Sequence, residues 1–249
     1  MKIAIPSHNR VNILKAKTYK LLLERGFDEN DIFIFTDNFD EYKDEFKNVI
    51  LSKDSITEKR NHIIEYFDEG EQIVEMDDDI DDIQTTKSGE DNKSVMNLKE
   101  FYEENFKMLF AGGMWGINST HNNFFATGED KYGLQLVSIC ATLCGYINDK
   151  RIKMTLKEKE DFERVLLYYQ MKKPILKRCG YGIKTNYWSG KGGIASDYDF
   201  EERINIQKES ADYLLEKYPE YVYQKERKNG IVDIKFRRKK HLMNYYNKN

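Results

Sequence analysis

Three consecutive aspartates, Asp77, Asp78 and Asp79, are the residues of this sequence best suited to chemistry. Adjacent carboxylates repel one another unless a positive charge lies among them, and a divalent cation meets that need. Oxygen ligands favour Mg²⁺ or Mn²⁺, which commonly take one or two protein carboxylates together with substrate phosphates. Because alternate side chains of an extended segment point the same way, Asp77 and Asp79 are predicted to bind one metal ion while Asp78 faces away. The structural alternative is a solvated acidic turn, since Asp81 and Asp82 follow closely.

The acidic triplet follows a short apolar segment that is typical of a buried strand, and earlier segments alternate between strand and helix patterns. In order, they are a strand at 2–5, a helix at 13–25, strands at 31–35 and 49–51, a helix at 57–67 and a strand at 72–76. Gly26 suits the end of the first helix, and Ser55 with Glu58 forms a capping box before the second. This alternation predicts an α/β fold with a mostly parallel sheet flanked by helices. Ligands of such sheets bind at the carboxyl ends of the strands, where the triplet stands.

Polar residues leave the other predicted strands at the same edge of the sheet. The loop after the first strand contains Pro6, Ser7, His8, Asn9 and Arg10. Its side chains and backbone amides are predicted to hold a nucleobase or ribose. Taken alone, each of these residues is an ordinary loop or cap residue, so the prediction rests on their convergence.

Two further segments are predicted to reach this edge. Asp37 ends the second strand and is placed to bond a base or a sugar hydroxyl. Arg60 and Asn61 lie in the helix before the acidic strand, and Arg60 is predicted to pair with phosphate or with the triplet.

The remaining two thirds of the chain are less regular. Helices are predicted at 98–110, 156–171 and 200–218, a turn and strand from 112, and a buried strand pair or one long strand at 134–147. A hairpin is predicted from 221–227 and 231–236, which Asn229-Gly230 joins with a type I′ turn signal. The simplest organisation is one domain at 1–198 with a C-terminal helix, hairpin and basic tail at 199–249 packed on it.

Composition limits the class of protein. Of the 249 residues, 40% are hydrophobic and 13% aromatic, which is too much apolar character for a disordered chain, and the 33% that are charged can cover a solvated surface. A net charge of −3 argues against non-specific coating of nucleic acid. Cys140, Cys144 and Cys179 show no metal spacing and are predicted to be free thiols. No targeting segment or membrane span is visible, so we expect a cytoplasmic protein without a membrane or an obligate protein partner.

Four of these segments together resemble a known family of enzymes. Segments 3–10, 35–37, 58–61 and 74–80 are similar, in order and spacing, to the donor half of a GT-A glycosyltransferase. The resemblance implies a nucleoside diphosphate sugar, most simply a UDP-sugar, and a Mn²⁺ or Mg²⁺ ion held by Asp77 and Asp79. It places donor contacts on Ser7, Asn9, Arg10, Asp37, Arg60, Asn61, Asp77 and Asp78.

Two features look most like one subgroup of this family. The triplet followed by Ile80 and the segment 112–118 resemble the TET-associated glycosyltransferases, a largely phage-encoded group. That resemblance implies a hydroxymethylated pyrimidine in DNA as the acceptor, and the host cytoplasm as the location. Alternatives are a glycan, lipid or protein acceptor, a nucleotidyltransferase or nuclease, and a binding module without turnover.

The acceptor side is predicted from fewer signals. Glu160-Asp161 resembles the acidic pair that many inverting GT-A enzymes place at the start of a helix, with Asp161 the first choice for the base and Glu160 the second. A charged, solvated helix face is the alternative. Trp115 and Gly116 are predicted to line the sugar or acceptor pocket, although a core tryptophan fits the sequence equally well.

Two basic features complete the candidates. Lys191 lies in a glycine-rich loop that lacks P-loop spacing, and it is predicted to approach phosphate in a lid or to be an ordinary surface residue. The tail at 235–241 is predicted to contact a nucleic-acid backbone or only to aid solubility.

Overall fold

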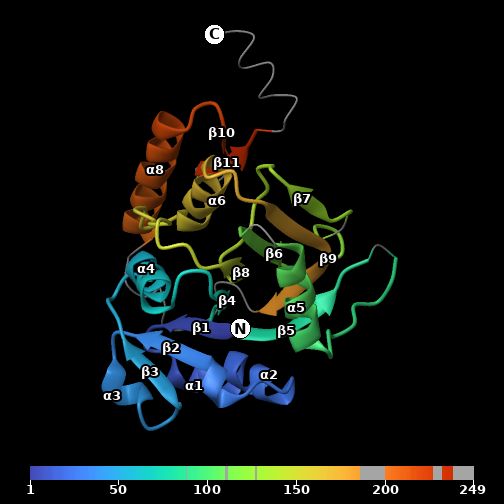
Figure 1. Cartoon of the computed structure of the whole chain (residues 1–249). Helices are drawn as coiled ribbons and strands as arrows, with labels where there is room; N and C mark the ends of the chain where they lie inside the picture. Colours follow the sequence, from blue (N-terminus) through green and yellow to red (C-terminus); the bar gives the residue numbers. More distant parts are fainter. Residues whose placement is uncertain (88, 110–111, 127, 186–199, 227–231, 238–249) are drawn as a thin grey trace.

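The computed structural model describes residues 1–87, 89–109, 112–126, 128–185, 200–226 and 232–237 (Figure 1). The first half runs β1 (Lys2–Ser7), α1 (Val11–Ala16), α2 (Thr18–Glu24), η1 (Glu29–Asp31), β2 (Ile32–Thr36), α3 (Phe39–Tyr42), β3 (Asn48–Leu51), α4 (Ile56–Tyr66), β4 (Gln72–Met76) and β5 (Ile80–Thr85). The second half runs α5 (Leu98–Met108), β6 (Met114–Asn118), β7 (Lys131–Gly133), β8 (Leu143–Ile147), α6 (Glu160–Gln170), β9 (Ile175–Thr185), α8 (Phe200–Lys217), β10 (Val222–Glu226) and β11 (Val232–Phe236).

The described residues form one nine-stranded sheet in the order β3-β2-β1-β4-β8-β6-β9-β5, with β7 also paired to β9. Strands β1, β2, β3, β4, β6 and β9 run in one direction, while β5, β7 and β8 run against them. The prediction of a mostly parallel α/β sheet is therefore confirmed. The predicted strands at 2–5, 31–35, 49–51 and 72–76 match β1 to β4 within two residues at each end.

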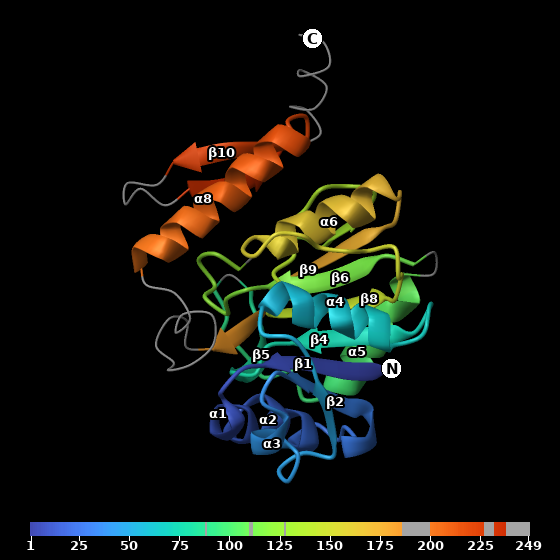
Figure 2. The same ribbon diagram turned by 90° about the vertical axis from the view of Figure 1, so that its left-hand side faces the viewer.

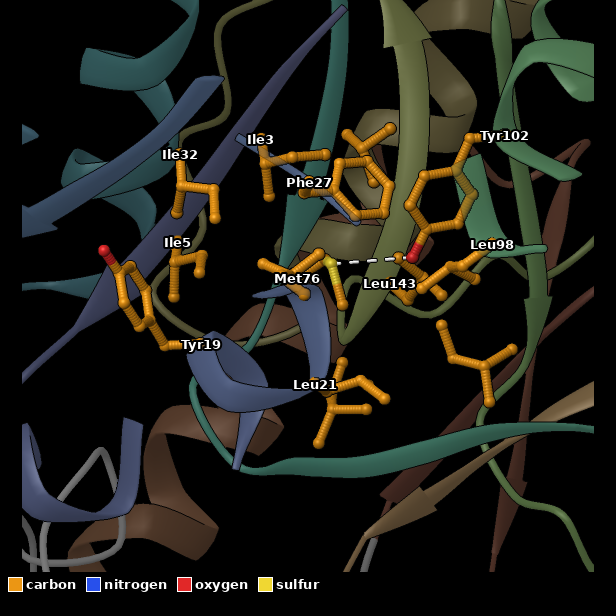
Figure 3. Packing of buried hydrophobic residues seen from close by; sticks show 14 of the residues in the cluster. Ile3, Ile5, Tyr19, Leu21, Phe27, Ile32, Met76, Leu98, Tyr102 and Leu143 are labelled. Atoms are coloured by element: carbon orange, nitrogen blue, oxygen red, sulfur yellow. Dashed lines mark hydrogen bonds between the residues drawn. The ribbon is translucent and has the colours of Figure 1, made fainter. Parts of the chain in front are cut away.

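Helices cover both faces of the sheet (Figure 1). Alternate side chains of β1 supply the two faces: Ile3 and Ile5 pack with α1, α2 and α5, whereas Ala4 packs with α4 and α6. Figure 3 shows the first of these cores, where the Tyr102 hydroxyl donates to Met76 Sδ over 3.5 Å. This two-sided burial makes the sheet a rigid platform whose strand ends can hold a site.

One predicted helix is split in two. The helix expected at 13–25 breaks at Lys17, and α2 starts at Thr18. The break turns the Thr18 hydroxyl toward the acidic triplet, where it donates to the Asp77 carbonyl over 2.8 Å and accepts from the Ile80 amide over 2.9 Å. A polar contact with the following turn has therefore overridden a continuous helical pattern.

Several described segments differ from their sequence-based assignments. No strand was predicted at β5, because Asp81 and Asp82 conceal its alternation. A strand pair or long strand was predicted for 134–147, yet only β8 at its end is a strand. The glycine-rich loop that contains Lys191 was predicted to begin at residue 181, but residues 181–185 form the end of β9 and pair with β5. In each case strand pairing across the sheet decided a segment with weak local preference.

The C-terminal elements pack onto α6. Leu156 and Leu166 form an apolar cluster with Leu214 of α8, Val222 of β10 and Ile234 of β11. Figure 2 shows α8 and β10 on the α6 side of the sheet, away from α1 to α3. The hairpin is antiparallel as predicted, while its Asn229-Gly230 turn lies outside the described residues. Within the described part of the chain, none of the helices combines the length and the apolar character that a membrane crossing requires.

Candidate active site

The acidic triplet forms the tight connection between β4 and β5. Its backbone is held from two sides, because the Asp77 amide donates to the Thr142 carbonyl over 2.9 Å and Thr18 bonds the Asp77 carbonyl and the Ile80 amide. The parallel pairing of β1 with β4 and β2 brings the loop after Ser7 beside this connection. The predicted convergence at one sheet edge is therefore present in the structure.

The three carboxylates have different surroundings. The Asp78 side chain is 6% exposed, accepts from the Ser7 hydroxyl over 2.7 Å and pairs with Arg10 over 3.1 Å. The side chains of Asp77 and Asp79 are 32% and 24% exposed. The turn thus buries the middle carboxylate against β1 and leaves its two neighbours partly open, as strand alternation suggested.

The two partly exposed carboxylates, Asp77 and Asp79, could supply part of the ligand set of a divalent metal ion. Burial raises the pKa of Asp77 to about 6, with the charges of Asp79 and Asp78 adding to the effect and Arg60 opposing it. Asp79 is also bonded by Thr185 over 3.2 Å and lies 3.4 Å from Arg10. Among the described residues, no three Asp, Glu, His or Cys side chains are grouped as metal ligands. An ion held by Asp77 and Asp79 would need its further ligands from elsewhere, such as phosphate oxygens and water.

Arg60 is buried, which corrects the expectation that its side chain faces a phosphate. Its guanidinium donates to Glu75 over 2.6 Å, to the Ala141 carbonyl over 3.0 Å and to Asp77 over 3.1 Å. Its Nε lies 3.5 Å from Oε1 of Glu160. The alternative prediction, a pairing with the acidic cluster, is the one the structure shows. Arg60 thereby connects the strand end of β4 to the start of α6.

The candidate nucleotide side is built around Asp37. Burial alone would raise the pKa of Asp37, but Lys59 at 2.6 Å and His8 at 2.8 Å hold it below its ordinary value. Lys59 is itself buried and also donates to the Asp54 carbonyl. Asn9 has φ of 52°, a left-handed conformation that Asn tolerates, and its amide lies 2.9 Å from His8 Nε2. The predicted residues here form one ordered polar cluster, and Pro6 is buried in β1 beside it.

Asn61 has a different task from the one predicted. Its amide donates to the Met154 carbonyl over 2.8 Å and its carbonyl accepts from the Met154 amide over 3.0 Å. Both polar groups of the side chain are thus used to hold the segment before α6. Asn61 is a structural residue here and does not face the candidate nucleotide side.

The Glu160-Asp161 pair begins α6. Burial raises the pKa of Glu160 to about 7, with Asp161 adding to the effect and Arg60 opposing it. Burial also raises the pKa of Asp161, against the hydrogen bond from the Phe162 amide over 2.8 Å. Glu163 and the following Arg164 are buried as well, so the alternative of a solvated helix face is wrong for the start of this helix. A carboxylate with a raised pKa suits a general base near neutral pH.

The segment 140–142 lies between the two acidic groups, and its place there was not predicted from the sequence. Cys140 is partly exposed, and after burial the charges of Asp161 and Asp77 contribute to raising the pKa of its thiol to about 11. Ala141 and Thr142 offer their carbonyls to Arg60 and to the Asp77 amide. No motif marks these residues, since two of the contacts come from the backbone. The three cysteines are free as predicted.

Comparisons with known proteins agree with this architecture. The sequence matches no family model, and no curated protein matches it significantly. The crystal structure of S. aureus TarS 1–349 in complex with UDP-GlcNAc superimposes with a TM-score of 0.51 over 86% of this chain and 67% of that chain, at 14% identity. A second crystal structure of S. aureus TarS 1–349 gives a TM-score of 0.50 at 13% identity, over 86% and 66% of the two chains. The chain has the GT-A fold.

The same comparison with the longer TarS chain covers 40% of it, at a TM-score of 0.50 and 14% identity. This chain therefore spans about two thirds of the shorter TarS chains and less than half of the longer one. At this identity the likeness concerns the fold.

Two predicted acceptor residues belong to the core of this GT-A domain. Trp115 is 0% exposed and packs among Phe101, Tyr102 and Phe106. A Cβ on Gly116 would lie 2.4 Å from the side chain of Ile139, so this glycine permits close packing behind the strand. The prediction that they line an open pocket is wrong for this structure, and the core alternative holds. Lys191 and residues 238–241 of the basic tail lie outside the described residues.

Proposed function

We propose that this chain is a metal-dependent glycosyltransferase that moves a sugar from a UDP-sugar to a hydroxyl acceptor, with inversion. The observation that carries the proposal is the arrangement of two acidic groups around Arg60. The partly exposed carboxylates of Asp77 and Asp79 lie on one side of it, and the Glu160-Asp161 pair lies on the other. The GT-A fold, shared with a structure that holds UDP-GlcNAc, supports the choice of donor.

The reaction assigns each group a task. Asp161 accepts the proton of the acceptor hydroxyl, whose oxygen attacks the anomeric carbon of the sugar as the bond to the diphosphate breaks. A single displacement of this kind inverts the anomeric configuration, and the nucleoside diphosphate leaves with the electron pair. A Mn²⁺ or Mg²⁺ ion on Asp77 and Asp79 would neutralise the charge that develops on the diphosphate.

For the acceptor, we propose a hydroxymethylated pyrimidine in DNA on the sequence resemblance of residues 77–80 and 112–118. Trp115 within that resemblance is a core residue, so the support comes from the pattern and not from a contact. A glycan acceptor is the second candidate, and the surface described in the next subsection favours it.

The donor assignment is tested by thermal stability. We expect UDP with Mn²⁺ at about 100 times its dissociation constant to stabilise the wild type by about 2.7 kcal/mol. Asp79→Ala should lose this stabilisation, whereas Asp81→Ala, which removes a neighbouring carboxylate paired with Lys17, should keep it. Release of UDP from a UDP-sugar, followed by chromatography, should show the same order. Stabilisation by nucleoside triphosphates and not by nucleotide sugars would instead favour a nucleotidyltransferase or nuclease.

A further inference from the structure

A surface hollow of about 620 Å³ lies beside β5, between residues 90–92 and residues 120–123. Its lining is polar, with the amides of Gln84, Asn92 and two further asparagines, the carboxylates of Glu90 and Asp91, a threonine and a histidine. None of these residues was singled out by the sequence, because no motif joins two loops about 30 residues apart.

The walls of the hollow are fixed to each other and to the sheet. The Asn92 amide donates to the His121 carbonyl over 2.6 Å, and the Asn123 amide donates to the Glu90 carbonyl over 2.9 Å. A Cβ on Gly182 would lie 2.1 Å from the Thr120 carbonyl oxygen, so the glycine lets this wall lie directly on β9. The hollow is therefore a built feature of the fold.

The lining chemistry suits a ligand rich in hydroxyl groups. Side-chain amides both donate and accept hydrogen bonds, and carboxylates accept them, so together they match hydroxyls that do both. The described lining contains two carboxylates and no Lys or Arg, while Lys87 and Lys93 are exposed on the neighbouring loop outside it. A chain of phosphodiesters would meet like charge at Glu90 and Asp91.

Two exposed aromatic rings follow the hollow in the chain. Phe124 is 84% exposed and Phe125 is 71% exposed, and their rings meet edge to face at 4.9 Å. The Phe124 amide donates to Asn122 Oδ1 over 2.9 Å, which fixes the start of this pair to the lining. Large apolar groups left open beside polar ones are typical of binding surfaces, and a ring face can stack on the apolar face of a sugar.

The hollow is near the candidate active site. Nδ1 of His121 lies 3.3 Å from the Ile183 carbonyl of β9. Two residues further along the same strand, the Thr185 hydroxyl bonds the Asp79 carbonyl over 2.8 Å. Two strand residues span about 7 Å, so one extended ligand can reach both places.

We propose that this hollow, with Phe124 and Phe125, binds a neutral carbohydrate segment of the acceptor. The proposal rests on the sugar transfer proposed above, and it takes the second candidate acceptor, a glycan, in place of DNA. It requires amides and carboxylates to bond sugar hydroxyls while a phenylalanine ring stacks on the sugar.

Saturation-transfer NMR on the full chain tests the proposal with four probes: maltotetraose, cellotetraose, chitotetraose and a thymidine tetranucleotide. We expect at least one neutral tetrasaccharide to receive saturation from the wild type, and the tetranucleotide to receive none that depends on the two rings. Phe124→Ala/Phe125→Ala should remove most of the sugar signal, because it removes the rings on which the sugar stacks. Leu51→Ala, which removes an exposed apolar side chain at the opposite sheet edge, should leave it unchanged.

The proposal is overturned if no tetrasaccharide binds, if the double variant binds sugars as the wild type does, or if only the tetranucleotide depends on the rings. UDP with Mn²⁺ is also added to both proteins, and the thermal stabilisation that it gives should be equal in the wild type and the double variant. UDP binding without sugar binding removes this inference alone. Absence of UDP binding in the wild type removes the proposed function, whatever the sugars do.

Discussion

The acidic triplet at the end of β4 and the hollow beside β5 are both polar, but they differ in how far their side chains are buried and bonded to other protein groups. At β4, Asp78 and Arg60 are buried and bonded to several protein groups. At the hollow, the walls are joined by two amide-to-carbonyl bonds, and Phe124 and Phe125 are open to solvent. The first region is preorganised around fixed charges, which suits a diphosphate and an ion. The second presents an open surface, which suits a ligand bound by many weak contacts.

The largest effect should come from the base of the first region. Asp161→Asn removes the proton acceptor, and we expect transfer to fall about 10²- to 10⁴-fold. Stabilisation by UDP with Mn²⁺ should be retained, since Asp161 does not belong to the proposed metal ligands. Asp212→Asn on the exposed face of α8 is the control. Near-normal transfer by Asp161→Asn in a single-turnover assay would remove this residue from the mechanism.

The next effect tests whether buried charges hold the first region together. Arg60→Met removes the ion pairs of Arg60 with Asp77 and Glu160. Glu75 also loses Arg60 but keeps its ion pair with Arg164. We expect the free energy of unfolding in urea to fall by about 3 kcal/mol. Arg151→Met removes an exposed partner of Asp149, where solvent screens the ion pair, and its loss of stability should be much smaller. Equal losses in the two variants would contradict the central place of Arg60.

A smaller effect concerns the pH dependence of transfer. Asp161 must be ionised to accept a proton, so activity should rise with pH through the raised pKa of the Glu160-Asp161 pair. Glu160→Gln removes the neighbouring negative charge, which favours ionised Asp161. The acid limb of the rate profile should then move to lower pH. A limb that stays in place or moves up would show that Glu160 does not influence the base.

The smallest effect should separate the second region from the core. Phe124→Ala and Phe125→Ala remove exposed rings, and each should change the free energy of unfolding by less than about 0.5 kcal/mol. Phe101→Ala removes a buried ring that packs against Trp115, and it should cost about 3–5 kcal/mol. A large loss in either exposed variant, measured by urea denaturation, would mean that the pair supports the fold and is not simply a binding surface.

Much of the fold was predictable because local patterns and tertiary structure agree. The strands β1 to β4 are apolar and short, and the Ser55 cap begins α4 as its motif predicts. The helix predicted at 156–171 is present but begins later, at Glu160, so the acidic pair stands in its first turn. The split at Lys17 and the strand β5 were missed, since both depend on contacts with residues far along the chain.

The sequence by itself determined that three carboxylates would stand at a strand end near a polar loop, because strand periodicity and the direction of parallel strands suffice for that inference. Only the tertiary structure decided that Arg60 is buried between Asp77 and Glu160, and that Trp115 belongs to the core. It alone brought residues 90–92 beside 120–123. The physical reason is that side-chain type states which bonds a residue can make, whereas packing decides which partners are within reach.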